Sequence, residues 1–111
     1  MGAPAGFAYA RKQLASSDKY TRRQALLLFE GAKAKTSAPV LTPLLGDSDP
    51  AVQAAAARIL YQGGEARMAL WLVAASDRAK LENKGPYETE LELLQLTDEQ
   101  RSALRKQAAG L

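Results

Sequence analysis

The stretch that decides the fold is residues 44–64, which read LLGDSDPAVQAAAARILYQGG. A turn at residues 46–50 comes before an alanine-rich run, and a pair of glycines closes it. Asp49 and Pro50 suit the N-cap and first position of a helix, because aspartate accepts from free N–H groups and proline lacks an N–H. The stretch predicts a helix that ends at the glycines and buries one apolar face, made of Val52, Ala56, Ile59 and Leu60.

The composition limits the chemistry of this chain. Of 111 residues, 47% are hydrophobic, 24% are charged and 6% are aromatic, which is typical of one small globular domain and favours helix over sheet. The sequence contains neither cysteine nor histidine. Disulfides, thiol nucleophiles, imidazole bases and the usual zinc and iron ligand sets are therefore excluded, and we expect no metal and no cofactor.

The sequence carries no membrane signal. No apolar run approaches the roughly 20 residues that span a bilayer, so we expect a soluble, cytoplasmic protein without membrane contact. The opening MGAPAG is rich in small residues and has no pattern. We expect residues 1–6 to be a disordered lead or a cloning remnant, and residues 7–111 to form one domain with capping helices at its C-terminal end.

Turn residues, mostly glycine and proline, divide the chain into segments of helical length. Asp18 and Ser37 suit N-cap positions, and Thr97 with Gln100 fits a capping box. No stretch alternates apolar and polar residues convincingly, so we expect an all-helical chain. Helices are expected at about residues 7–15, 18–33, 37–45, 50–62, 65–76, 86–96 and 98–109, with a short amphipathic piece before residue 83.

Two segments, residues 18–33 and 65–76, are expected to supply much of the core. The first carries a stripe of helical spacing at Ala25, Leu28 and Phe29. The second is the most hydrophobic part of the chain, and we expect it to be the centre of the core. Its large apolar residues are Met68, Leu70, Trp71, Leu72 and Val73.

The sequence repeats itself at the interval that separates Asp18 from Asp49, which we call the repeat interval. Shifting the chain by this interval also places Ala25 on Ala56. A single helical unit cannot bury its own apolar face, so the repeat predicts a stack of similar units. The other coinciding pairs are Thr21 with Val52, Leu28 with Ile59 and Phe29 with Leu60.

In the same stretch, a helix ending in two leucines meets an Asp-x-Asp-Pro turn and then a helix that opens with valine. The residues are Leu44, Leu45, Asp47, Ser48, Asp49, Pro50, Val52, Ala55, Ala56 and Leu60. From about residue 14 to 76 the chain resembles the HEAT repeat, specifically the short bacterial HEAT-like form found in pigment lyases. The resemblance implies an all-α, right-handed α-α superhelix, a short solenoid of two to three antiparallel helix pairs.

The chain departs from the family pattern at three points. Its repeat interval is shorter than the roughly 40–47 residues of the eukaryotic type. Position 53 is glutamine, where the family usually has an arginine that pairs with an aspartate of the adjacent unit, whereas Arg22 keeps it one repeat earlier. We therefore predict that Arg22 lies near Asp47 or Asp49 and bridges the first two units. Beyond Asp77 the pattern decays, which indicates a cap rather than another full unit.

No catalytic constellation is recognisable. Glu88, Glu90 and Glu92 are expected to be solvated, with the first and last sharing one helical face. The glycines form no phosphate-binding loop. An enzyme, or a lyase accessory acting on pigments, is disfavoured because no nucleophile or acid pair accompanies these residues, so we expect no enzymatic activity.

We expect a non-enzymatic interaction or scaffold module that presents a ridge or shallow groove to another protein. An acidic partner is one option, and self-association through an open end of the stack is another. The exposed partner-binding positions are expected to be Lys19, Arg22, Arg23, Arg58, Tyr61 and Gln62.

The basic N-terminal third supports an alternative function, nucleic-acid binding. Residues 1–35 hold seven Lys and Arg residues against Asp18 and Glu30. A basic face on stacked helices can bind phosphates. The net charge of only +3 and the few interleaved aromatics make this the second hypothesis. The residues involved would be Arg11, Lys12, Lys19, Arg22, Arg23, Lys33 and Lys35.

Overall fold

The computed structural model describes residues 3–110, and every regular element within that range is helical, which confirms the all-helical fold class. Residues 1 and 2, part of the lead expected at residues 1–6, lie outside the described residues. The first helix begins at Ala3 rather than at residue 7. The elements, with η for a short 3₁₀ helix, are α1 (Ala3–Leu14), α2 (Lys19–Leu26), η1 (Leu27–Phe29), α3 (Ala34–Leu41), η2 (Thr42–Gly46), α4 (Pro50–Gln62), α5 (Met68–Arg78), α6 (Leu81–Leu93) and α7 (Asp98–Ala109).

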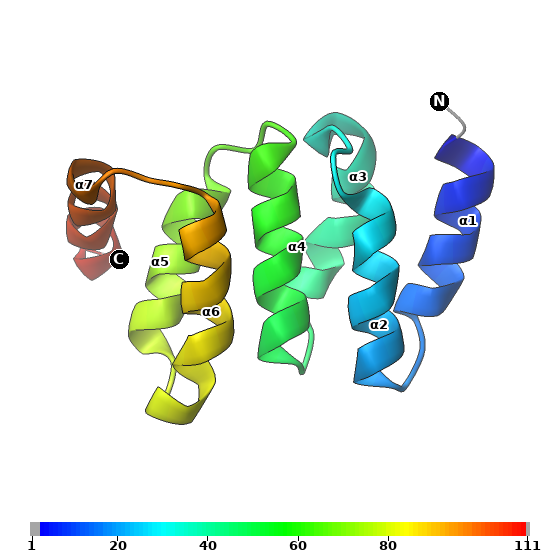
Figure 1. The fold of residues 1–111 in the computed structure, drawn as a ribbon, viewed down its shortest axis with the longest axis horizontal. Helices are drawn as coiled ribbons and strands as arrows, with labels where there is room; N and C mark the ends of the chain where they lie inside the picture. The colour runs from blue at the N-terminus through cyan, green and yellow to red at the C-terminus, as the bar shows by residue number, and fades with distance from the viewer. Residues whose placement is uncertain (1–2, 111) are drawn as a thin grey trace.

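The helices form a two-layered stack (Figure 1). Helices α2, α4 and α6 lie side by side in one layer, with α3 and α5 behind them, and α7 follows at the end of the stack against α5. The three front helices begin at Lys19, Pro50 and Leu81, so each starts one repeat interval after the one before. We call the pairs α1–α2, α3–α4 and α5–α6 units 1, 2 and 3. The spacing therefore continues into a third pair, past Asp77, where the sequence pattern decays.

The helix caps predicted at Asp18, Asp49 and Thr97 are confirmed, whereas the one predicted at Ser37 is not. Asp18 and Asp49 each accept a hydrogen bond from a backbone N–H in the first turn of the following helix, at 3.0 and 3.4 Å. Thr97 and Gln100 form the reciprocal capping box, with bonds of 2.8 and 3.0 Å. Since a cap fixes the residue at which a helix starts, these local signals set the register of the helices.

The core lies between the two layers and repeats with the units. Phe29, Leu60 and Leu91, which follow one another at the repeat interval, are all fully buried. One apolar cluster joins units 1 and 2, and a second joins units 2 and 3. Burying each of these side chains contributes about 2 kcal/mol, so every unit depends on its neighbour for stability.

Leu28 does not belong to the core, contrary to prediction. Its side chain is 54% exposed, whereas Ile59, at the equivalent position of unit 2, is 1% exposed. Ile59 packs in the cluster shared with unit 1. Leu28 lies at the end of the stack, where the described residues provide no earlier unit to cover it. Leu26, in the first cluster, is buried instead.

Three more helix starts differ from prediction. Helix α5 begins at Met68 rather than at residue 65. Helix α3 begins at Ala34, whose N–H donates to the Gly63 carbonyl at 2.9 Å. Ser37 therefore lies inside this helix and donates its hydroxyl to a backbone carbonyl one turn earlier, rather than forming an N-cap. Helix α6 runs through Pro86 instead of beginning there. The local turn signals favoured later starts for α3 and α6, and α3 begins instead where Ala34 meets Gly63 at the end of α4.

The hydrophobic segment of α5 is only partly core. Leu72 and Val73 are buried, whereas Met68, Leu70 and Trp71 are half-buried. Helix α5 lies in the rear layer of a stack only two helices deep, so one of its sides faces α4 and α6 and the other faces solvent.

Candidate functional site

The predicted bridge between units 1 and 2 is confirmed. Arg22 donates to both carboxylate oxygens of Asp47, through Nε and Nη2, each at 2.9 Å. Its Nη1 also donates to the Ser16 carbonyl at 2.9 Å. A two-point contact fixes orientation as well as distance, so this pair determines how α2 lies against the turn that precedes α4.

A second arginine makes the same kind of contact one residue later. Arg23 donates to Asp49 Oδ2 at 2.7 Å and to Oδ1 at 3.0 Å. These bonds hold the pKa of the Asp49 carboxyl below its ordinary value and raise the pKa of the Arg23 guanidinium. Arg22 and Arg23, which we expected to be exposed and available to a partner, are therefore both engaged in holding units 1 and 2 together.

Arg58 joins all three units. Its Nη2 donates to Glu30 of unit 1 at 2.5 Å, and its Nε donates to Glu90 of unit 3 at 2.5 Å. The hydrogen bonds with Glu30 raise the pKa of Arg58 and lower that of Glu30. Contrary to expectation, Arg58 is only 8% exposed, because it lies between the helices it connects.

The other residues expected to bind a partner are spread over two helices. Lys19 and Gln62 are exposed, and Tyr61 is half-buried. Gln62 accepts from Arg58 at 2.9 Å and donates to the Leu93 carbonyl at 3.4 Å. The six expected residues thus do not form one free surface, since four of them bond to neighbouring helices or turns.

Of the three α6 glutamates that were expected on a solvated face, Glu88, Glu90 and Glu92, two are engaged instead. Glu90 belongs to the three-unit bridge, and Glu88 accepts from the Ser76 hydroxyl and from Arg101 Nη2, the latter at 3.1 Å. The Ser76 bond lowers the pKa of Glu88. Only Glu92 is exposed. Helix α6 packs against α4 and α5, so much of its surface meets protein instead of water.

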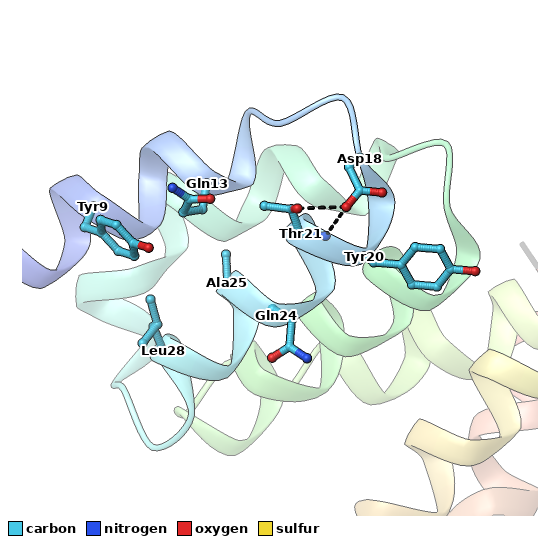
Figure 2. A pocket seen from close by; sticks show the side chains of 8 residues that line it. All are labelled: Tyr9, Gln13, Asp18, Tyr20, Thr21, Gln24, Ala25 and Leu28. Carbon is cyan, nitrogen blue, oxygen red and sulfur yellow. Dashed lines mark hydrogen bonds between the residues drawn. The ribbon is translucent and has the colours of Figure 1, made fainter.

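A groove of about 350 Å³ lies between α1 and α2 (Figure 2), the two helices of unit 1. We call it the α1/α2 groove. Tyr9, 62% exposed, lies toward one end and Tyr20, 60% exposed, toward the other. Its volume falls in the range of sites that hold a small molecule or a few side chains of a partner. Tyr9 and Gln13 come from α1, and Thr21, Gln24, Ala25 and Leu28 from α2 and the turn after it.

Tyr20 is flanked by two cations. The Lys19 ammonium lies 5.4 Å and the Arg23 guanidinium carbon 5.0 Å from the centroid of the Tyr20 ring. Each contact is attractive by roughly 0.5–1 kcal/mol at an exposed site. They favour one position of the ring at the end of the groove.

Sequence reasoning did not identify this groove. The repeat itself contained the signal, because the first unit of a stack has no earlier neighbour to cover its outer face. That inference requires knowing which side of α2 faces away from unit 2, and only the packing of the units shows it.

The groove combines apolar area, two side-chain amides and the Asp18 carboxylate. Such a lining suits binding by contact and hydrogen bonding. Among residues 3–110, no group of three or more acidic side chains is placed to hold a metal ion. In the same part of the chain, no helix has the length and apolarity needed to cross a membrane.

Comparison with known families gives one match. A family model described as HEAT repeats matches residues 8–82, more than half of the chain. The matched range covers α1 from residue 8 onward, α2, unit 2, helix α5 and the first residues of α6. Comparisons with curated proteins and with solved structures give no match.

Proposed function

Because this chain belongs to the HEAT-repeat family, we propose that it is a non-enzymatic module that binds another protein through the α1/α2 groove. HEAT repeats are generally interaction or scaffold modules and are typically without enzymatic activity. The observation that carries the choice of site is the gathering of exposed apolar groups there. Tyr9, Tyr20 and Leu28, three of the six large hydrophobic residues that are exposed among those described, line this one groove.

Exposed apolar side chains that occur singly need no explanation, whereas clusters often mark binding surfaces. Here Tyr9 and Tyr20 offer rigid rings with polar tips, and Leu28 and Ala25 lie between them. Tyrosine is enriched in protein interfaces, because it buries a large area and loses little rotamer entropy. The lining therefore favours a protein ligand.

The ion pairs beside the groove favour a pre-formed site. Arg22 and Arg23 attach α2 to unit 2, and Arg58 attaches Glu30, at the other end of the same segment, to α4. A site held rigid before binding loses less entropy when it binds. The proposed binding surface thus lies on the best-anchored helix of unit 1.

The same ion pairs weaken the nucleic-acid hypothesis. Arg22 and Arg23 are central to the basic set that could meet phosphates, and both are engaged by aspartates at 2.7–3.0 Å. Phosphate binding would have to compete with these carboxylates. We therefore favour a protein partner over an oligonucleotide.

Site-specific photo-crosslinking in the native host tests the proposal. A photoreactive phenylalanine derivative replaces Leu28 in the groove, and in a matched variant it replaces Leu81, which is 84% exposed at the start of α6. We expect a discrete protein crosslink from position 28 and none of that size from position 81. Equal products from both positions, or none from position 28, would reject the groove as the binding site.

A further inference from the structure

We propose that the α1/α2 groove binds an amphipathic helix of a partner protein, parallel to α2, with an arginine that pairs with Asp18. This inference rests on the proposed function and adds the class of ligand and its orientation. The model for this binding is the packing of α2 on unit 2, because unit 2 uses the equivalent surface to hold α2 of unit 1. Figure 1 shows α2 and α4 running side by side in the same direction.

The groove matches the covered surface of unit 2 residue by residue. Thr21, Ala25 and Leu28 occupy the positions of Val52, Ala56 and Ile59, and those three are buried in the cluster shared with unit 1. On the other wall, Tyr9 and Gln13 correspond to Val40 and Leu44, which pack against the same cluster. Of these positions, Ala25 is buried as Ala56 is, whereas Leu28 is exposed although Ile59 is covered in unit 2.

The turns that begin the two front helices are also equivalent. Residues 16–18 read Ser-Ser-Asp, and residues 47–49 read Asp-Ser-Asp. In the first turn, the Asp18 N–H donates to the Ser16 hydroxyl at 3.1 Å. In the second, the Asp49 N–H donates to an Asp47 carboxylate oxygen at 2.9 Å. Asp18 is thus placed as Asp49 is placed, at the N-cap and beside the surface that receives a neighbouring helix.

Asp49 receives Arg23 from α2, and Asp18 lacks an equivalent partner. Two hydrogen bonds to the Asp18 carboxylate come from Thr21 and end on Oδ2, at 3.0 and 2.8 Å, and the Tyr20 backbone N–H and the charge of Arg22 also stabilise the carboxylate. Among the described residues no ion pair involves Asp18. Its Oδ1 can therefore accept from an incoming guanidinium, as Asp49 Oδ1 accepts from Arg23.

The groove is more polar than the covered surface of unit 2. Gln13 and Gln24 occupy the positions of Leu44 and Ala55, and threonine replaces valine at position 21. These polar groups keep the free face soluble, as expected for the end of a stack. They favour a partner that binds reversibly, rather than a permanently stacked helical unit.

The contacts of α2 with unit 2 predict the sequence pattern of the ligand helix. On α2, Arg23 pairs with unit 2 and Leu26, one turn later, is buried in the shared cluster. The ligand helix should therefore carry an arginine followed by leucine three positions later. Within the helices, Arg11 and Leu14 of α1 and Arg101 and Leu104 of α7 have this spacing. Leu14 is buried in the first cluster, and Arg101 binds Glu88 while Leu104 packs in the second cluster. Because both helices are occupied in this way, we assign the ligand to a different protein.

A labelled synthetic peptide with the sequence of residues 18–30, which contains α2, serves as the probe. Its binding to the full chain is followed by fluorescence anisotropy. We expect saturable binding that weakens about tenfold when the peptide carries Arg23→Ala or when the protein carries Asp18→Asn, since a hydrogen bond to a charged group is worth about 1.5 kcal/mol. Asparagine retains N-cap capacity, so the second change leaves the helix start intact.

Two protein variants separate the outcomes. Leu28→Ser changes the groove, and Leu93→Ser changes an equally exposed leucine on α6. The proposal is supported if peptide binding is lost with Leu28→Ser and Asp18→Asn, but not with Leu93→Ser. Loss with Leu28→Ser alone would retain the groove as a protein site and overturn the arginine pairing. Binding unaffected by both changes would overturn the pairing and the site together.

Light scattering of the unmodified chain tests whether the groove binds a second copy of the chain instead. We expect one mass across the concentration range used for anisotropy. A dimer that is lost in Asp18→Asn would show that the groove takes a second copy of the chain, and it would overturn the assignment to a different protein.

Discussion

The stack has two junctions, the first between units 1 and 2 and the second between units 2 and 3. Their front helices follow at the same repeat interval, but different side chains join them. At the turn end of the first junction, Arg22 and Arg23 of unit 1 bind Asp47 and Asp49 of unit 2. At the turn end of the second, Gln53 takes the place of Arg22. Its Oε1 accepts from the Tyr87 hydroxyl of unit 3 at 2.9 Å, and its Nε2 donates to the Asp47 carbonyl. The turn end of the first junction is thus charged and that of the second is neutral, while Arg58 forms ion pairs across both.

The turn before α6 explains the change. Its residues Arg78-Ala79-Lys80 occupy the positions of Asp47-Ser48-Asp49, so both acids are replaced by bases. Arg78 lies near enough to Tyr87 to influence its ionisation. An arginine at position 53 would meet these bases, whereas glutamine can bond to the phenol. The comparison shows that the helices of successive units take equivalent positions, although the side-chain contacts that join the units differ.

The largest expected effect concerns Arg58, the residue that both junctions share. Arg58→Ala should lower the free energy of unfolding by about 3 kcal/mol, because it leaves the Glu30 and Glu90 carboxylates without their cation. Urea unfolding followed by circular dichroism measures it. Arg67→Ala is the control, since its ion pair with Glu65 is exposed and should have little effect on stability. A loss below about 1 kcal/mol for Arg58→Ala would show that the junctions do not depend on this bridge.

The next test removes one turn-end contact from each junction. Arg22→Leu should cost about 2 kcal/mol, because the nearly buried Asp47 loses a two-point charged hydrogen bond. Tyr87→Phe should cost only about 1 kcal/mol, because it removes a neutral hydrogen bond. Both are measured by urea unfolding, with the slope against denaturant as a check on the unfolded state. Equal losses would contradict the distinction between a charged and a neutral junction.

A third test converts the neutral junction toward the charged one. Gln53→Arg restores the residue type of unit 1 but should destabilise the chain by roughly 1 kcal/mol, because the Tyr87 bond is lost and Arg78 and Lys80 repel the new charge. Adding Arg78→Asp should recover part of that loss. A double-mutant cycle measures this coupling, which we expect to favour the pair by about 0.5–1 kcal/mol. A coupling near zero would mean that the bases of this turn are not the reason for glutamine.

The smallest expected effects concern the pH dependence of stability, which should differ between the two junctions. Asp49 and Glu30 have pKa values lowered in the folded chain, chiefly by hydrogen bonds from Arg23 and Arg58. Their contribution is present above the ordinary carboxyl pKa of about 4 and is lost as pH falls through the folded values. Acid should therefore weaken the first junction, and Asp49→Asn should reduce that slope.

At alkaline pH the sign is reversed. Burial raises the pKa of Tyr87, so its contribution is complete below the ordinary phenol pKa of about 10 and is lost as pH rises toward the folded value. Tyr87→Phe should remove this alkaline slope and leave the acid slope unchanged. Thermal unfolding across the acid and alkaline ranges, in steps on the order of one pH unit, measures both. An alkaline slope that persists in Tyr87→Phe would contradict the assignment.

Short-range signals made much of the fold predictable. The caps at Asp18, Asp49 and Thr97 fixed three helix starts, because a side chain and the N–H groups it binds lie within a few residues of each other. The repeat, together with the family arginine that position 22 keeps and position 53 lacks, also predicted the Arg22 bridge. The candidate site was less predictable, since Lys19 alone among the six expected residues is an exposed cation.

Sequence by itself determined that the chain is helical, where most helices begin, that they recur at a constant interval and that unit 1 binds unit 2 through Arg22. Tertiary structure alone decided which residues are free. It buried Arg58 among three units, turned two α6 glutamates into ion-pair partners and left Leu28 open, although its repeat equivalent Ile59 is covered. The reason is physical: hydrogen bonds within one turn depend on neighbours in the chain, whereas the exposure of a side chain depends on which unit, if any, lies beside it.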